Sequence, residues 1–137
     1  MKKYDDEMKQ AFTEKFGSAP ETLGYTIDGP PLWLTLLMLG GILAAFLQKP
    51  YIIGFYGEEA KGIKTSVWKT TTLKDETMTL KKSDIANVKF KKFGPSRFFT
   101  VKMNDGTTHH FVMNSLYKAL ESQPAAIEAM KSFLGVV

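Results

Sequence analysis

Apolar residues recur at helical spacing near the start of the chain. In the stretch KKYDDEMKQAFTEKFGS they are Tyr4, Met8, Ala11, Phe12 and Phe16, separated mostly by charged residues. Residues three or four positions apart line one side of an α-helix. The pattern predicts a short amphipathic helix that ends at glycine 17, because glycine is the preferred residue just after a helix.

Turn-forming residues follow this helix. The stretch SAPETLGYTIDGPP contains two glycines, three prolines and scattered polar residues. Glycine and proline interrupt helices and strands, so we expect a linker. Residues 1–30 are therefore interpreted as an amphipathic helix with a linker.

A run without any charged residue extends from Gly29 to Gln48. A helix of about this length crosses the roughly 30 Å of a bilayer's hydrocarbon core. Trp33 and Tyr51 lie where an aromatic belt is expected, and Lys49 is placed to reach lipid headgroups. The residues expected to contact lipid are Leu32, Trp33, Leu34, Leu36, Leu37, Leu39, Ile42, Leu43, Phe46 and Leu47.

Basic residues around this run predict its orientation. The segment before it contains only Lys15 close by, whereas Lys49, Lys61 and Lys64 follow it. Lysine and arginine resist transfer across a membrane, so the C-terminal part is expected on the cytoplasmic side.

Two other interpretations of the run remain open. A helix that is apolar on every side is also typical of a segment buried inside a protein. Gly40-Gly41 can kink the run into a hairpin that enters only one leaflet. Residues 31–49 are thus interpreted as an apolar helix, either inserted in the membrane or buried.

The later sequence alternates apolar and polar residues and has frequent turn signals, which is typical of β-strands. The predicted features are two strands around a turn near Gly57-Glu58, a strand broken at Lys74-Asp75, and a strand from Ile85 to Phe93 closed by Gly94-Pro95.

Asp105-Gly106 between two alternating runs predicts a hairpin with a type I′ turn. The register of such a turn places Phe99, Val101, Met103 and Val112 on one face. The other face then carries Phe98, Thr100, Lys102, His109, Phe111 and Met113.

A final amphipathic helix is predicted in the stretch SQPAAIEAMKSFLG. Ser122 is suited to its N-cap, Pro124 to its first turn and Gly135 to its end. Its apolar side consists of Ala126, Ile127, Met130, Phe133 and Leu134. Residues 50–137 therefore predict a mainly β (α+β) domain of curled antiparallel sheets or a small barrel, capped by a C-terminal helix.

Three stretches, YIIGFYGEEAKGI, MTLKKSDIANVKF and FFTVKMNDGTTHHFVM, followed by the final helix, resemble the bacterial pleckstrin-homology-like (PH-like) domains. The resemblance covers about residues 51–134, and its most characteristic part is LKKSDIANVKF. It implies a PH-like sheet with a capping helix, no enzymatic activity, and a role in protein interaction or oligomerisation. The basic pattern that phosphoinositide-binding relatives carry between their first strands is missing, so no headgroup specificity is implied.

Composition and charge narrow the class of protein. The 137 residues are 44% hydrophobic, which suits one domain, and the chain has no cysteine for disulfides or thiolate chemistry. The net charge is +4, and 14 of the 18 basic residues follow Pro30. The basic residues expected to attract an anionic membrane surface are Lys81, Lys82, Lys89, Lys91, Lys92, Arg97 and Lys102. A solvated surface is the alternative, and nucleic-acid binding is a weaker one.

Catalytic chemistry has little support in the sequence. His109 and His110 are adjacent on a predicted strand, so their side chains point to opposite faces and do not converge on one metal. Neither a Gly-x-Ser-x-Gly motif nor a phosphate-binding glycine loop is present. We expect no catalytic residue, metal or cofactor.

The sequence therefore predicts a non-enzymatic PH-like interaction module at the cell membrane, with its C-terminal domain in the cytoplasm. Its expected partners are membrane lipid and a protein or a second copy, without a small-molecule substrate. The alternative is a soluble cytoplasmic homo-oligomer that uses the apolar helix as a subunit interface.

Overall fold

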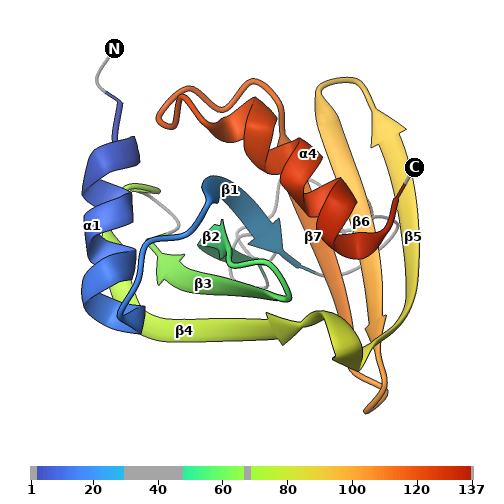
Figure 1. Ribbon diagram of the computed structural model, residues 1–137. Helices are drawn as coiled ribbons and strands as arrows, with labels where there is room; N and C mark the ends of the chain where they lie inside the picture. The colour runs from blue at the N-terminus through green and yellow to red at the C-terminus, as the bar shows by residue number, and fades with distance from the viewer. Residues whose placement is uncertain (1–2, 30–47, 67–68, 137) are drawn as a thin grey trace.

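The computed structural model describes residues 3–29, 48–66 and 69–136. Within these ranges, seven antiparallel strands form one sheet with a helix near each end of the chain (Figure 1). The elements are α1 (Asp5–Phe16), β1 (Thr22–Asp28), β2 (Lys49–Phe55), β3 (Glu59–Thr65), β4 (Leu73–Lys81), the 3-10 turn η1 (Lys82–Asp84), β5 (Ile85–Phe93), β6 (Ser96–Met103), β7 (Thr108–Asn114) and α4 (Gln123–Leu134). This confirms the predicted mainly β (α+β) class.

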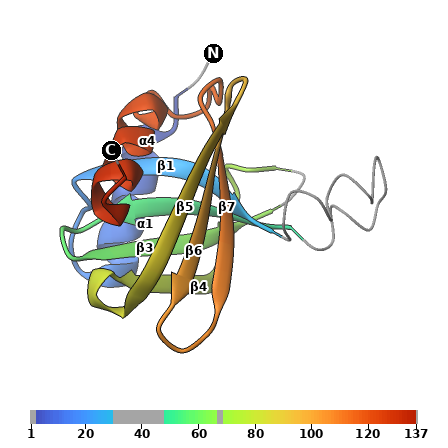
Figure 2. The ribbon, with the colours of Figure 1, turned by 90° about the vertical axis from the view of Figure 1, so that its right-hand side faces the viewer.

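The strand order is β4-β3-β2-β1-β7-β6-β5, so two meanders meet where β1 lies beside β7. This seam contains only two register pairs, Ile27 with Val112 and Asp28 with Phe111. Strands β5 to β7 run steeply across the direction of β1 to β3 (Figure 2). Although β4 and β5 follow one another in the chain, they form the two opposite edges of the sheet.

Helix α4 covers the inner face of the curled sheet. All five residues of its predicted apolar side are buried in the main hydrophobic cluster, together with residues such as Phe99 and Phe111. The helix lies directly on β1 at Gly24, where an added Cβ atom would stand 2.3 Å from the Cβ of Ala126. Gly135 ends the helix with a φ of 72°, as its position predicted.

Gln123, the first residue of α4, joins the two meanders where their strands diverge. Its side chain is fully buried. Its Oε1 accepts the N–H of Tyr25 at 2.7 Å, and its Nε2 donates to the carbonyls of Tyr25 and Asn114 at 2.9 and 3.1 Å. Where β1 and β7 are no longer paired with each other, the Gln123 amide therefore provides hydrogen bonds to the backbone of both strands. Ser122 donates its hydroxyl to the Leu23 carbonyl rather than capping the helix.

Helix α1 packs on the opposite face of the first meander. Met8 and Phe12 are buried in a second cluster with Leu23 and Ile52, so β2 is buried on both of its faces. Gly17 ends the helix with a φ of 88°, which confirms the predicted end.

One prediction about the strands is wrong, and a second is only partly confirmed. The stretch interpreted as a linker contains β1, which lies at the middle of the sheet. Gly24 is present there because α4 packs closely on the strand, so it does not mark a turn. Strand β4 extends from Leu73 to Lys81 and includes Lys74 and Asp75, but its pairing with β3 is irregular there, because Thr65 pairs with Leu73 and Ile63 with Thr77.

The β6–β7 hairpin exists, but its predicted register is wrong by one residue. Only Gly106 has a positive φ in this turn, whereas a type I′ turn needs two such residues. Met103 donates its N–H to the Thr107 carbonyl, which makes the loop one residue longer than predicted. A shift of one residue exchanges the faces of a strand, so Phe111 is buried beside Phe99.

The predicted apolar helix lies outside the described residues, which include none of its ten expected lipid contacts. Within the described part of the chain, neither α1 nor α4 is long and apolar enough to cross a membrane.

Candidate functional site

The two ends of the apolar segment are held side by side. Asp28, the last residue of β1, is the register partner of Lys49, the first residue of β2. Partners in an antiparallel pair have Cα atoms about 5 Å apart. The chain therefore leaves the sheet after β1 and re-enters it beside the same point. We call this point the root; in Figure 2 it lies on the side of the sheet away from α4.

Hydrogen bonds connect the root to β7. The Oδ2 atom of Asp28 lies 2.7 Å from Nδ1 of His109, and its Oδ1 accepts the N–H of His110 at 3.1 Å. Gly29 donates its N–H to the His110 carbonyl at 3.1 Å. His109 also stacks on Phe111, with 5.2 Å between the ring centroids. The side chain of His109 points to the inner face with that of Asp28. His110, the next residue of the strand, therefore points to the opposite face, as the sequence predicted.

Tyr51 does not lie in an aromatic belt as predicted. Its side chain is buried at 5% exposure and donates its hydroxyl to Glu76 at 3.2 Å. Burial, assisted by the Glu76 carboxylate, raises the pKa of Tyr51 to about 12. Glu76 also lies 3.8 Å from Lys64. Of the residues expected near headgroups after the run, only Lys49 is exposed.

The structure divides the seven predicted basic residues into three groups. Lys81 and Lys82 lie at the junction of β4 with η1. Lys92 and Arg97 are register partners beside the Gly94-Pro95 turn, where Arg97 donates to the Gly94 carbonyl at 2.8 Å. The remaining three lysines are Lys89, Lys91 and Lys102.

These three lysines point to the face of β5–β7 that lies away from α4. Their positions alternate along the strands with those of Val88 and Phe90 on β5 and of the buried residues Phe99 and Val101 on β6. We call this surface the outer face. Strands β5, β6 and β7 contain five basic residues and no acidic residue. None of these lysines or Arg97 takes part in an ion pair within the described ranges.

A row of half-buried apolar residues crosses the outer face toward the root. Ile27, Val112 and Phe98 are successive register partners across β1, β7 and β6, and Lys91 continues the row on β5. The neighbouring row runs from Lys89 through Thr100 to His110, whose carbonyl binds Gly29 at the root. With strands about 4.8 Å apart, Lys89 stands roughly 15 Å from the root.

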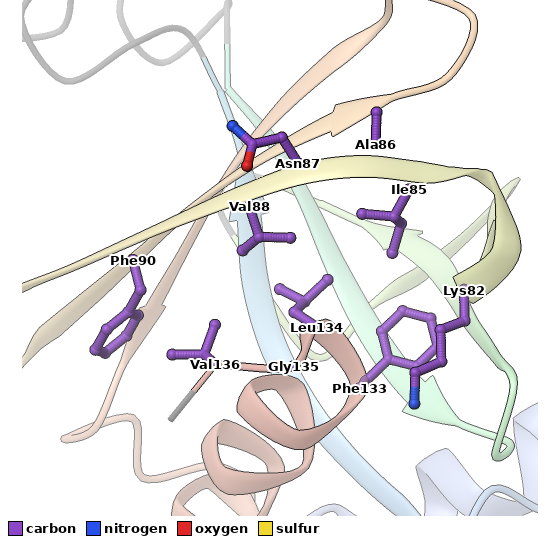
Figure 3. Close-up of a pocket in the computed structure, with 10 residues that line it drawn as sticks. All are labelled: Lys82, Ile85, Ala86, Asn87, Val88, Phe90, Phe133, Leu134, Gly135 and Val136. Atoms are coloured by element: carbon purple, nitrogen blue, oxygen red, sulfur yellow. The ribbon is translucent and has the colours of Figure 1, made fainter.

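An open groove lies between β5 and the end of α4 and has a volume of about 510 Å³. Ile85, Val88 and Phe90 point from β5 toward α4, where Leu134 and Val136 face them (Figure 3). Phe90 packs on the core through Phe99, with 5.0 Å between ring centroids. Asn87 and Ala86 lie on the other side of the strand in Figure 3.

Cations border this groove. Lys82 lines one end, beside Phe133. Lys92 shares the strand side of Val88 and Phe90 and follows Phe90 by two residues, but it does not line the groove. Lys131 stands 5.5 Å from the centroid of Phe90 and 3.8 Å from the exposed Glu128 carboxylate.

The sequence does not reveal this groove. Its spacing predicts β5 and α4 separately and places Phe133 and Leu134 on the apolar side of the helix. That β5 forms an edge, with α4 alongside it, depends on strand order, which no local pattern encodes. The apolar alternation of Val88 and Phe90 with Lys89 and Lys91 was the signal that indicated two distinct faces.

No family model matches this chain, and no characterised protein or solved structure matches it.

Proposed function

We propose that the protein is a non-enzymatic, membrane-associated interaction module of PH-like architecture. The apolar segment between β1 and β2 enters the bilayer, and the outer face lies toward the cytoplasmic leaflet. A four-strand and a three-strand meander that meet at β1 and β7, with a C-terminal helix on the inner face, support the PH-like assignment.

The observation that carries this proposal is the pairing of Asp28 with Lys49. A single crossing would separate the two ends of the segment by the roughly 30 Å of the hydrocarbon core. Register partners are only about 5 Å apart. The segment therefore enters and leaves on one side, and both α1 and α4 lie on that side.

The length of the segment limits how deep it reaches. Eighteen residues, 30–47, separate the described ends. Two helical arms of about nine residues would each rise about 13 Å, which is less than half of the hydrocarbon core. We accordingly propose insertion into one leaflet, the hairpin interpretation of Gly40-Gly41.

Charge on the outer face supports the orientation. A lysine close to an anionic leaflet contributes about 1 kcal/mol, so Lys89, Lys91 and Lys102 together contribute about 3 kcal/mol. The apolar row of Ile27, Val112 and Phe98 lies between Lys91 and the root. Such attraction orients a domain that is already anchored.

Cysteine labelling tests the one-sided insertion, because the natural chain has no cysteine. Ser18→Cys follows α1 and Ser132→Cys lies on α4, and both positions are exposed. In inverted membrane vesicles, an impermeant maleimide should label both variants, and in right-side-out vesicles neither. Labelling of the two positions from opposite sides would refute the proposal.

Fractionation tests the insertion itself. The full chain should sediment with membranes and resist extraction by alkaline carbonate. Complete recovery without detergent, as a defined oligomer, would instead support the homo-oligomer whose apolar segment packs between subunits.

A further inference from the structure

Two large apolar side chains are exposed at the same end of β5, β6 and β7. Among the residues that the structure describes, Phe93 is 69% exposed at the end of β5, and Leu116 is 58% exposed two residues after β7. We call this end, residues 93–96 and 115–116, the tip; the turn from β5 to β6 lies at the top of Figure 2. Single exposed apolar residues are common on protein surfaces, whereas two that share one end indicate an interaction site.

Hydrogen bonds hold the two turns of the tip together. Ser115 donates its N–H and its hydroxyl to the Pro95 carbonyl, each at 2.9 Å. Arg97 donates to the carbonyls of Gly94 and Ser96 at 2.8 and 3.2 Å. The exposed apolar side chains are thus presented on fixed turns, which reduces the conformational entropy that binding would cost.

Cations flank the tip. Lys92 and Arg97 are register partners beside the turn from β5 to β6, and Lys118 lies in the segment after β7. Within residues 85–120 the only acidic residue is Asp105, which lies in the turn at the opposite end of β6 and β7. An apolar end with a cationic border complements an anionic lipid surface, where apolar groups enter the acyl boundary and lysines reach the headgroups.

The side chain of Phe93 points to the outer face, because it shares the strand side of Lys89 and Lys91. Three strand spacings separate β5 from β1, and Phe93 lies three residues beyond Phe90, which is in the same row as Asp28. Phe93 therefore stands roughly 17 Å from the root along the sheet. A domain attached at one point can rotate about it, whereas a second contact at this distance fixes which face lies on the leaflet.

We propose that the tip is a second membrane contact, in which Phe93 and Leu116 enter the headgroup region of an anionic leaflet. The neighbouring cations Lys92, Arg97 and Lys118 then contact lipid phosphates. This contact rests on the proposed function, because insertion at the root brings the tip to the bilayer. It holds the outer face on the leaflet and α4 toward the cytoplasm.

The test uses the full-length protein in vesicles that contain phosphatidylserine, with an environment-sensitive fluorophore on a single introduced cysteine. Leu116→Cys places the fluorophore at the tip, and Ser132→Cys places it on α4 as the control. Nitroxide-labelled lipids should quench the fluorophore at position 116 and leave the one at position 132 unquenched. Quenching at position 116 should be weaker in vesicles of phosphatidylcholine alone, because these carry no net negative charge.

Two substitutions of Phe93 test the aromatic contact in the Leu116→Cys chain. Phe93→Ala should lower the ratio of lipid-contacting to free tips about tenfold, because a large apolar side chain no longer leaves water. Phe93→Trp should keep the contact, since tryptophan is favoured at the membrane interface. The side chain of Phe93 is exposed, so both variants should fold with unchanged thermal unfolding.

Carbonate-resistant sedimentation of the same samples separates the tip from the root. A chain that stays inserted but shows equal quenching at positions 116 and 132, or no effect of Phe93→Ala, would overturn the tip contact and leave the insertion intact. A fluorescence shift at position 116 that follows protein concentration, without quenching by lipid, would assign the tip to a protein partner instead. A chain recovered without membranes would refute the proposed function and this inference together.

Discussion

The buried amide of Gln123 gives the sharpest test of the fold. It makes three hydrogen bonds, at 2.7, 2.9 and 3.1 Å, to backbone groups of β1 and β7. The two strands share only two register pairs, and Gln123 joins them at the end opposite the root, where Thr26, Asp28 and Gly29 make the other hydrogen bonds to β7.

Gln123→Met keeps the length of the side chain and removes all three bonds. A buried hydrogen bond contributes about 1 kcal/mol net, and an unpaired buried group costs at least as much. We expect the free energy of unfolding to fall by about 3 kcal/mol, from a total of about 5–15 kcal/mol. The corresponding decrease in Tm is about 10 °C.

Gln123→Glu adds a dependence on pH with a defined sign. Burial and the two carbonyls of Tyr25 and Asn114 disfavour the carboxylate, so the pKa of this glutamate in the folded protein rises above its unfolded value of about 4.3. A group whose pKa is higher in the folded than in the unfolded protein contributes its full stabilisation at pH values below the unfolded pKa. This contribution is lost as the pH rises through the folded pKa. The variant should therefore be closest to the wild type near pH 4 and furthest from it near pH 8.

The assay is urea unfolding followed by circular dichroism at both pH values, with the wild type measured beside each variant. Gln10→Glu is the matched control, because Gln10 is exposed on α1. Its effect should stay within about 0.5 kcal/mol at either pH. A loss below about 1 kcal/mol for Gln123→Met, or equal losses at pH 4 and pH 8 for Gln123→Glu, would show that the amide does not join the meanders.

Three further predictions concern other contacts. Gly24→Ala should lower the free energy of unfolding in urea by about 2–3 kcal/mol, because the added methyl group keeps α4 from approaching β1. Adding Ala126→Gly to the same chain should restore part of this loss. If the losses of the two substitutions simply add, the contact between residues 24 and 126 is contradicted. Burial raises the pKa of Asp5, but the hydrogen bonds that its carboxylate accepts from the backbone N–H groups of Glu121 and Ser122 together outweigh this, so the pKa is lowered. Its contribution is present above about pH 4 and is lost as pH falls, so Asp5→Asn should cost about 1 kcal/mol at pH 7 and less near pH 2. Burial raises the pKa of Tyr25 and of Tyr51 to about 12, and it also raises the pKa of Tyr56 and of Tyr117. Absorbance titration should therefore show late ionisation of these tyrosines, with stability falling between about pH 10 and pH 12. Ionisation of all tyrosines near pH 10 in the folded protein would contradict this.

Elements with a strong local period were predictable from the sequence. The buried positions of α1 and α4, and the span of β5 from Ile85 to Phe93, agree with the structure. A helix or strand with one apolar side reveals that side through spacing alone. The Asp105-Gly106 turn revealed a hairpin for the same reason, but not its register, because two loop lengths suit that dipeptide.

The sequence also determined the charge of β5–β7 and the apolar character of residues 30–47, since both are properties of composition. Only the tertiary structure decided that the expected linker is the central strand β1, that the ends of the apolar segment meet at Asp28 and Lys49, and that β5 is an edge with a groove beside it. These features depend on pairing between residues far apart in the chain, such as Ile27 with Val112. Local spacing shows which side of an element is apolar, whereas the packing of the whole chain selects the element that covers it.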